Sequence, residues 1–305
     1  MVLQIGRRLA QALAVLFGVS IVVFLLLRLS GDPTSLMLPL EATPEEREAM
    51  RRQLGLDEPI FLQYLDFVWR AVQGDLGGSL RGGGPALELV LERLPATALL
   101  AGSAMLLAIL IAFPIGVIAA LKPGSALDRA STTFALFGQS IPNFWFGLIL
   151  ILIFAVQLRL LPTGGMGGFA NLILPTVTLA FWSAARTARL IRSGMIEALS
   201  QDYVRTAKAK GLSRFTVVVR HGLRNVMLPV VTVIGLDLAV LLGGAVVTET
   251  VFAWPGVGRL VVDSIAQRDF PVVQAAVLVI AVIYVVVNLV VDLLYTVLDP
   301  RTRVA

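Results

Sequence analysis

The sequence predicts an all-α membrane protein with six transmembrane helices. Hydrophobic residues make up 57% of the chain, charged residues only 15%, and the mean hydropathy is +0.86. A soluble domain carries about 25% charged residues. The apolar residues also gather in runs of about 20, the length that crosses a bilayer as a helix. We therefore expect a single transmembrane domain over residues 1–305.

The first span is predicted at residues 9–29. Residues 9–27 form an uncharged run of 19 residues, about 28 Å of helix against a hydrocarbon layer of about 30 Å. Arg7 and Arg8 precede it as in a signal peptide, but the run is long for a signal sequence and no small-residue cleavage site follows closely. A retained helix is favoured. The later spans are predicted at residues 96–121, 130–158, 171–192, 225–248 and 272–292.

Charge placement predicts the orientation of these spans. Residues 30–94 contain six basic and eleven acidic side chains, whereas residues 185–225 contain nine basic and two acidic ones. The positive-inside rule places the second segment in the cytoplasm and, by parity, both chain ends there too. Residues 30–94 are then external. The net charge of +5 is explained by basic residues that anchor the cytoplasmic side of the protein at the membrane. Since no basic surface is interleaved with aromatic residues, nucleic-acid binding is not expected.

The external segment is expected to fold into helices. Thr43, Pro44 and Glu46 form a capping box with proline at the first helical position, and Gly55 can stop that helix. A second helix is expected from Pro59 onward, ending at a glycine, Gly74. Its apolar face is predicted to pack at the outer mouth of the spans; the residues are Phe61, Tyr64, Leu65, Val68 and Val72.

Several kinds of site are excluded by composition. The chain has no cysteine and one histidine, His221. Disulfides, iron–sulfur clusters, thiolate metal sites and polyhistidine sites therefore cannot be built. No G-x-x-x-x-G-K-[ST] sequence occurs, so this chain does not bind nucleotide through that motif. We expect neither catalysis nor a metal or cofactor in this chain.

The polar stretch DYVRTAKAKGLS (residues 202–213) lies within a basic cytoplasmic loop at residues 196–224. Ser200 is a candidate N-cap for a short helix, and Gly211 can supply the left-handed residue that ends it. Ser213 can cap a second helix. Small side chains at the tip would let another protein approach the backbone; they are Ala207, Ala209 and Gly211. The pattern indicates a docking element.

Nearly the whole chain resembles the membrane-spanning permease subunits of dipeptide/oligopeptide-type ABC importers. The motifs that carry the resemblance, besides residues 202–213, are GVSIVVFLLLRLSGDP (18–33), LGLDEP (54–59), GDLGGS (74–79), ERLPAT (92–97), HGLRNVMLP (221–229), ETVFAWPGVGRL (249–260), RDFPVVQ (268–274) and LDPRTR (298–303). The short N-terminus, the large external segment and WPGVG resemble the first of two paralogous permeases.

The resemblance implies the type I ABC importer fold, with external amphipathic helices and a cytoplasmic coupling helix. It implies import of short peptides by alternating access across the plasma (inner) membrane of a prokaryote. The implied partners are a second permease, two ATP-binding subunits that hold ATP and Mg²⁺, an external solute-binding protein and membrane lipid. The same branch of importers also carries nickel chelates, glutathione and opines, and these stay open as alternatives.

The resemblance assigns the cytoplasmic loop to contact with the ATPase subunits. The general E-A-A pattern reads Arg205-Thr206-Ala207 here, so one of its three residues matches. The alternative is a basic loop that only satisfies topology and touches lipid headgroups. The expected coupling residues are Asp202, Tyr203, Arg205, Ala207, Lys208, Gly211 and Leu212.

Four polar residues in spans are candidates for lining the passage: Asp237, Gln139, Asn143 and Asn288. A midspan carboxylate costs about 2.5–3.5 kcal/mol on insertion scales, so Asp237 should face a cavity or a partner. It either lines the passage and attracts a peptide amino group, or bonds to the second permease. Pro142 interrupts the third span, as a hinge, as part of the lining, or as a packing kink.

The motif WPGVG predicts a tight external turn. By resemblance it is an outer gate or a seat for the binding protein, and the alternative is an interfacial aromatic anchor. The residues concerned are Trp254, Pro255, Gly256 and Arg259. A stand-alone secondary transporter is a remote alternative for the whole chain, because only Asp237 is clearly midspan and no internal repeat is evident. An intramembrane enzyme is not expected either, because the sequence lacks the residue pairs that such an enzyme needs.

Overall fold

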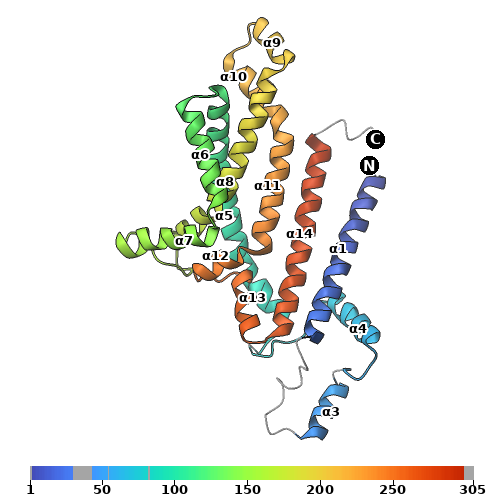
Figure 1. The fold of residues 1–305 in the computed structure, drawn as a ribbon. Coiled ribbons are helices and arrows are strands. Elements are labelled where there is room, and N and C mark those ends of the chain that lie inside the picture. Colours follow the sequence, from blue (N-terminus) through green and yellow to red (C-terminus); the bar gives the residue numbers. More distant parts are fainter. Residues whose placement is uncertain (1, 30–42, 54, 82, 299–305) are drawn as a thin grey trace. The chain divides into compact units, whose positions relative to one another are not determined.

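The computed structural model describes residues 2–29, 43–53, 55–81 and 83–298, and this part of the chain is almost entirely helical (Figure 1). The main helices are α1 (Val2–Leu29), α3 (Pro44–Gln53), α4 (Ile60–Val72), α5 (Ala86–Leu121), α6 (Ala126–Ser140), α7 (Asn143–Leu150), α8 (Phe169–Ser200), α9 (Asp202–Ala209), α11 (Arg224–Gly244), α12 (Val246–Val251), α13 (Val257–Ala266) and α14 (Phe270–Leu298). A π-helical stretch, η1 (Ile151–Gln157), extends α7, while α10 (Arg214–Thr216) and π-helical η2 (Val217–Leu223) lead into α11. Residues 30–42 of the external segment and 299–303 of the last motif lie outside the described residues.

The chain forms two compact units. Residues 1–95 and 256–285 make up the first, and residues 96–255 and 286–305 make up the second. Helices α5 and α14 continue from one unit into the other. Each unit has its own core, and the predicted coupling and passage residues all belong to the second.

Within the described residues, four helices are long and apolar enough to cross a membrane, or five if one sharply bent pair counts as a span. The four comprise residues 6–26, 86–121, 214–243 and 270–292. They match the predicted first, second, fifth and sixth spans. Helix α8 covers the predicted fourth span but is not in this group, since arginines and other polar residues interrupt its apolar sequence.

The predicted third span is not one straight helix. Helices α6 and α7 meet at 104° across a short break. Ile141 is extended, with φ −88° and ψ 125°, and Pro142 follows it. Proline has no N–H to continue the α6 ladder and disfavours helical geometry in the residue before it. The interruption expected at Pro142 is therefore confirmed, and the predicted third span at residues 130–158 corresponds to a bent pair of helices.

In the first unit, α4 packs on α1 through aromatic side chains. The Tyr64 ring lies edge-on to Phe24, with ring centroids 5.4 Å apart, and its hydroxyl is 2.8 Å from the Ser20 hydroxyl oxygen. Phe67 stacks on Phe24 from the same side. The predicted packing face of α4 is partly right, because two of its five residues, Tyr64 and Val68, are half-buried. The other three residues, Phe61, Leu65 and Val72, are exposed.

The capping signals of the external helices are confirmed. The Thr43 backbone N–H donates to Glu46 Oε2 at 2.9 Å, and the Glu46 N–H donates to Thr43 Oγ1 at 3.3 Å, closing the predicted capping box at the start of α3. Gly55 and Gly74 both adopt positive φ after their helices. These local signals could be read without any tertiary information, because capping depends on neighbours in sequence.

A buried carboxylate joins two motifs within the first unit. Asp269 accepts a hydrogen bond from the Ser79 hydroxyl and another from the Leu80 N–H at 3.1 Å. The sequences GDLGGS and RDFPVVQ therefore meet at this side chain. Beneath it, a core of small and branched residues links the start of α5 to α13 and α14; its members are Ala86, Val90, Val257, Val272, Ala275 and Ala276.

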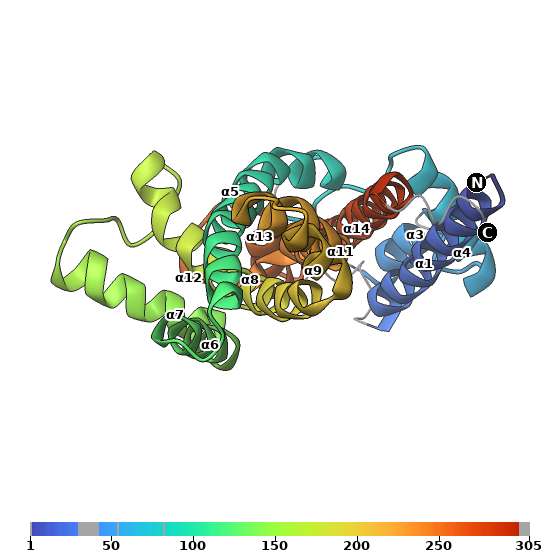
Figure 2. The same ribbon diagram turned by 90° about the horizontal axis from the view of Figure 1, so that it is seen from above.

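In the second unit, α8 lies between α6 and α11, as Figures 1 and 2 both show. The approach is close because the contact residues are small. A Cβ placed on Gly138 of α6 would lie 2.3 Å from Ala185 Cβ, and one on Gly194 would lie 2.7 Å from Val226. Membrane helices commonly associate through such residues, because without a hydrophobic driving force they depend on close backbone packing.

We expect Gly138→Ala to destabilise the second unit by about 1–3 kcal/mol, the cost of forcing a methyl group into a filled core. The matched control is Gly102→Ala in α5, where the added Cβ meets nothing within 4 Å. That change should be neutral or slightly stabilising, since alanine is the better helix former. Thermal unfolding of the two variants in detergent gives the comparison. Equal midpoints would contradict the tight α6–α8 contact.

Candidate functional site

The loop predicted to be cytoplasmic folds into a compact helix–turn–helix, which we call the coupling unit (residues 202–223). It projects from the end of α8 (Figure 1). Gly211 ends α9 at φ +75°, and Ser213 caps α10 by accepting from the Thr216 N–H at 3.3 Å, both as predicted. The predicted cap at Ser200 is wrong. Its hydroxyl donates to the Glu197 carbonyl at 2.7 Å because α8 continues to that residue.

The underside of the coupling unit is anchored by apolar packing. Val204, Ala207 and Val217 are buried together, with Leu199 of α8 against them. Ala207 therefore faces inward, so the prediction that its side chain is presented at the tip is wrong. The physical reason is helical spacing, since positions three apart on α9 share a face with Val204. The packing makes α9 an extension of the α8 body.

The opposite side of the coupling unit offers charged and aromatic side chains. Phe215 is 77% exposed, and Tyr203 and Leu212 are each 40% exposed. The exposed polar members of the surface are Asp202, Arg205, Lys208 and Lys210. Tyr203 is nevertheless held in place, since its hydroxyl accepts from Asn225 Nδ2 at 2.9 Å. Large apolar side chains ringed by charges characterise a protein contact surface.

A hollow of about 510 Å³ lies beside this surface. Its walls come from the end of α5, the end of α8 and the coupling unit. The residues include Ala120, Ile196, Leu199, Lys208, Leu212 and Val217. A partner that grips the coupling unit could place a side chain here, in direct contact with the ends of two long helices.

Asp237 is paired within its own chain. Its Oδ1 accepts a hydrogen bond from Arg186 Nη1 at 2.7 Å, linking α11 to α8. The carboxylate is 1% exposed, whereas the arginine side chain is 41% exposed. The guanidinium also lies 5.5 Å from the ring centroid of Trp182. Asp237 is thus buried against an arginine of its own chain, and its role toward the passage or a second permease stays a prediction.

A second ion pair ties the C-terminal part of α8 to the start of α6. Arg192 donates through Nε and Nη2 to both oxygens of Asp128, with the Nη2–Oδ2 distance at 2.9 Å. Asp128 also accepts from the Gly124 N–H at 2.8 Å, which fixes the turn between α5 and α6. Sequence reasoning missed this pair. The signal available was the spacing of the arginines on α8, but their partners are distant in sequence.

The other passage candidates lie elsewhere. Gln139 is exposed on the last turn of α6 and donates back to the Ala135 carbonyl at 3.1 Å. Asn143 begins α7 and is half-buried, so these two residues flank the break at Pro142. Asn288 is half-buried on α14. The structure therefore does not gather the four candidates into one site.

The Trp254 side chain is buried and cannot serve as a surface contact. It is 1% exposed, and its indole N–H donates to the Ala96 carbonyl at 2.9 Å. Nearby, Thr97 donates to the buried carboxylate of Glu249 at 2.8 Å. This corrects the expected gate, seat or interfacial role for the tryptophan ring. Pro255 is half-buried, Gly256 is buried, and Arg259 forms an ion pair with Asp263 at 3.6 Å.

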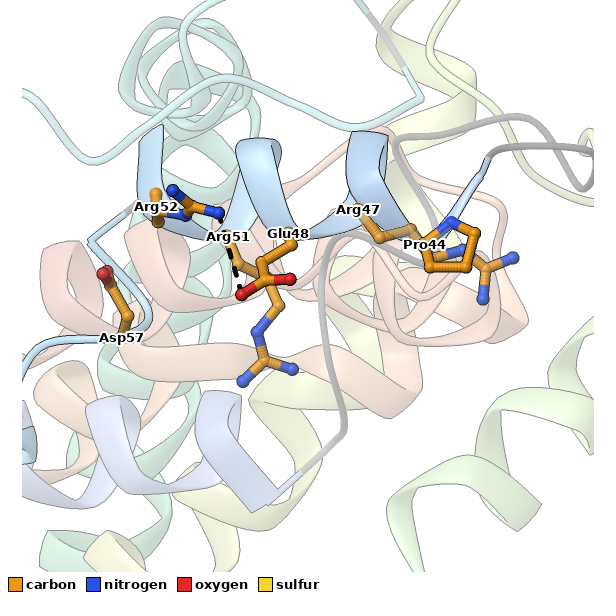
Figure 3. A pocket seen from close by; sticks show the side chains of 6 residues that line it. All are labelled: Pro44, Arg47, Glu48, Arg51, Arg52 and Asp57. Carbon is orange, nitrogen blue, oxygen red and sulfur yellow. Dashed lines mark ion pairs between the residues drawn. The ribbon is translucent and has the colours of Figure 1, made fainter.

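A charged hollow of about 760 Å³ on α3 does not form a site (Figure 3). Its walls are Pro44, Arg47, Glu48, Arg51, Arg52 and Asp57, all exposed side chains. The dashed line in Figure 3 marks the Arg52–Glu48 pair at 3.7 Å, whose partners are 66% and 71% exposed. Exposed pairs of this kind contribute little energy. We assign no ligand to it.

Comparison with known proteins gives a consistent result. Residues 112–304 match the family described as binding-protein-dependent transport system inner membrane component, and residues 1–101 match its N-terminal part. The oligopeptide transport system permease protein AppB of Bacillus subtilis is 42% identical over 99% of both chains. The dipeptide transport system permease protein DppB of Escherichia coli K12 is 40% identical over 97% of both chains. The glutathione transport system permease protein GsiC of Escherichia coli O6:H1 is 44% identical, also over 97% of both.

Solved structures show the same fold at low identity. An inward-facing form of the MetNI methionine ABC transporter has a TM-score of 0.57 at 17% identity, covering 69% of this chain and 96% of that one. An amino acid ABC transporter solved with histidines gives a TM-score of 0.53 at 18% identity, with 70% and 94% covered. With family matches across both halves and relatives above 40% identity end to end, the chain belongs to the inner membrane permease subunits of binding-protein-dependent ABC transport systems.

Proposed function

We propose that this chain is one of two paralogous permeases in an ATP-driven importer of short peptides. Two ATP-binding subunits holding ATP and Mg²⁺ dock on its cytoplasmic side, and an external solute-binding protein delivers the cargo. The chain performs no chemistry itself, and transport proceeds by alternating access between inward-open and outward-open states. Both chain ends lie in the cytoplasm, in keeping with the excess of positive charge at residues 185–225.

The observation that carries this proposal is the construction of the coupling unit. A loop that only satisfied topology would need its charges but no fixed shape. Here the unit is capped by Ser213, closed by Gly211 and packed on Val204 and Val217. Its outer surface still exposes Phe215 to 77%. A rigid element with an exposed aromatic surface is suited to receive force from a second protein.

The coupling unit is joined directly to the transmembrane helices. Helix α8 runs unbroken from Phe169 to Ser200, and only Gln201 separates it from α9. The buried contact between α9 and Leu199 prevents the short helix from pivoting freely. A displacement of α9 by the ATPases is therefore transmitted to α8. The Asp128–Arg192 and Asp237–Arg186 pairs pass it on to α6 and α11.

Short peptides are the favoured cargo because relatives named for oligopeptide and dipeptide transport match the chain from end to end. Glutathione is the second candidate, since a permease named for its transport is 44% identical. Glutathione is itself a modified tripeptide, so the two candidates share free carboxylates and amide groups. Purifying the cognate binding protein and identifying what it releases on denaturation would choose between them.

Reconstitution tests the assembly. Proteoliposomes holding this chain, its sister permease and both ATPases should accumulate a labelled di- or tripeptide only when ATP and the loaded binding protein are supplied. Leaving out the ATPases should abolish uptake, because the chain has no energy source of its own. Uptake by this chain alone would point instead to a secondary transporter.

Cysteine labelling tests the docking surface, since the chain has no native cysteine. Ala209→Cys places a thiol on the exposed side of α9, and Ala207→Cys places one on the buried side. Bound ATPases should slow maleimide labelling at Ala209→Cys severalfold or more, because a docked subunit covers this exposed thiol. Ala207→Cys should react slowly whether or not they are present. Unchanged labelling of Ala209→Cys in the transporting complex would contradict the docking geometry.

Cysteine labelling also tests the orientation of the chain in the membrane. In intact cells, a membrane-impermeant reagent should spare Ala209→Cys and label Gln73→Cys, an exposed position after α4. Labelling of both from outside would contradict the proposed topology.

The glycine turn gives a test of coupling. Gly211→Val forces a β-branched residue to φ +75°, a conformation that costs an L-residue about 1–2 kcal/mol or more. We expect ATP hydrolysis to continue while uptake falls severalfold. Gly211→Asn is the matched control, because asparagine tolerates this conformation and the added Cβ meets nothing within 4 Å. It should retain most uptake, and similar losses in both variants would show that bulk at the surface matters instead of the turn.

A further inference from the structure

One face of α8 is largely polar over the C-terminal half of the helix. Trp182, Arg186, Arg189, Ser193 and Glu197 follow a spacing of three and four residues and share this face. The last three are exposed and the first two are half-buried. The opposite side is buried among small residues, including Ala184 and Ala188. The polar face therefore remains open after α8 has packed on α6 and α11.

This face cannot be directed at lipid. Charged side chains within the hydrocarbon layer turn toward the protein interior or toward a water-filled cavity, because burial of a bare charge is expensive. Arg186 is the eighteenth residue of α8 and lies about 25 Å along the helix axis from its first residue. That distance is within the hydrocarbon thickness of about 30 Å. Because the Arg186 side chain is 41% exposed although it is paired with Asp237, we expect its exposed side to face water or a ligand.

Arg186 is held in a fixed position and still presents a cationic surface. Asp237 Oδ1 accepts a hydrogen bond from Arg186 Nη1 at 2.7 Å, and the Trp182 ring centroid lies 5.5 Å from the guanidinium carbon. A guanidinium has five N–H donors in a rigid fork. The side chain is 41% exposed, whereas Asp237 behind it is 1% exposed. The next arginine on the face, Arg189, is exposed and adds positive charge.

The polar atoms behind Arg186 are incompletely satisfied. Asp237 Oδ2 and the Ser183 hydroxyl are both buried, and neither makes a hydrogen bond of normal geometry among the described residues. The Ser183 hydroxyl nevertheless lies beside the carboxylate as its hydrogen-bond donor, in a loose geometry. Buried polar groups are usually hydrogen-bonded, and a bound water can complete a pair of this kind. Asp237 and Ser183 are thus a buried polar pair on the protein side of Arg186.

We propose that Arg186 binds the C-terminal carboxylate of the cargo during its passage, with Asp237 and Trp182 as positioning residues. The assignment rests on the proposed peptide function, and it holds for glutathione as well because that cargo also carries free carboxylates. Arginine suits a carboxylate through two parallel N–H···O bonds. Because the buried acid already neutralises part of the guanidinium charge, the site is selective without being tight.

The test compares trialanine with its C-terminal amide in proteoliposomes holding the complete importer. Both are supplied at concentrations that saturate the binding protein. Arg186→Gln should slow uptake of the free acid by about tenfold or more, the size of a charge-assisted hydrogen bond. Uptake of the amide should slow by a much smaller factor, because loss of the α8–α11 ion pair affects both cargoes alike and only the acid also loses its carboxylate contact. The binding protein is the same in both complexes, so its own preference cancels in the comparison of the two ratios.

Two further variants keep the test informative if Arg186→Gln alone folds poorly by leaving Asp237 unpaired. The double variant Arg186→Gln/Asp237→Asn replaces the ion pair by a neutral hydrogen-bonding pair, a change that buried ion pairs often tolerate. It should show the same loss of acid-over-amide preference. Arg186→Lys keeps the charge without the fork and should show an intermediate preference.

The outcomes separate the hypotheses. Equal slowing of acid and amide in the double variant would mean a structural role for the pair and overturn the assignment. If the Arg186 variants no longer co-purify with the sister permease, the α8 face is a subunit interface, and the assignment of Arg186 as a carboxylate site is overturned. If the wild-type complex imports a non-peptide cargo that has no carboxylate, the proposed peptide function is wrong, and the carboxylate site at Arg186 is wrong with it.

Discussion

The membrane interior offers no water to charged groups, and this constraint organises the second unit around α8. The helix carries Arg186, Arg189 and Arg192 where a spanning segment is expected, and two of these charges are paired with acids on neighbouring helices. Each pair crosses between helices, so each also acts as a tether. Arg192 holds α6 through Asp128, and Arg186 holds α11 through Asp237. Charge that would oppose insertion of an isolated helix thereby specifies how three helices assemble.

Close packing and ion pairing act together along α8. Ala185 meets Gly138, and Gly194 meets Val226, at separations that leave no space for a larger side chain. Such contacts set the distance between helices but allow sliding along the axis. The ion pairs oppose sliding, most of all the bidentate Arg192–Asp128 pair, whose geometry is directional. A push on α9 is therefore expected to move α6, α8 and α11 as a body instead of shearing them apart.

Local signals in the sequence predicted local structure well. The capping box at Thr43, the cap at Ser213 and the left-handed Gly211 all depend on neighbours within a few residues, and all are confirmed. Apolar runs predicted the long helices for the same reason. The burial of Trp254 was not predicted, since its partner Ala96 is distant in sequence. The burial of Ala207 was missed although its spacing from Val204 is local. Ala253 is a further case: it takes the left-handed position that ends α12, where sequence reasoning expects glycine.

Asp237 shows why a midspan acid cannot be interpreted alone. The sequence allowed a carboxylate that lines the passage or one that bonds to a second subunit, and both ideas treated it as the functional group. In the structure the Asp237 carboxylate is buried, and its partner Arg186 is the exposed member of the pair. A transport site must bind cargo strongly enough to admit it and weakly enough to release it. An unpaired arginine at this depth would hold an anion too firmly, whereas one already shared with Asp237 can exchange a cargo carboxylate for water as the helices move.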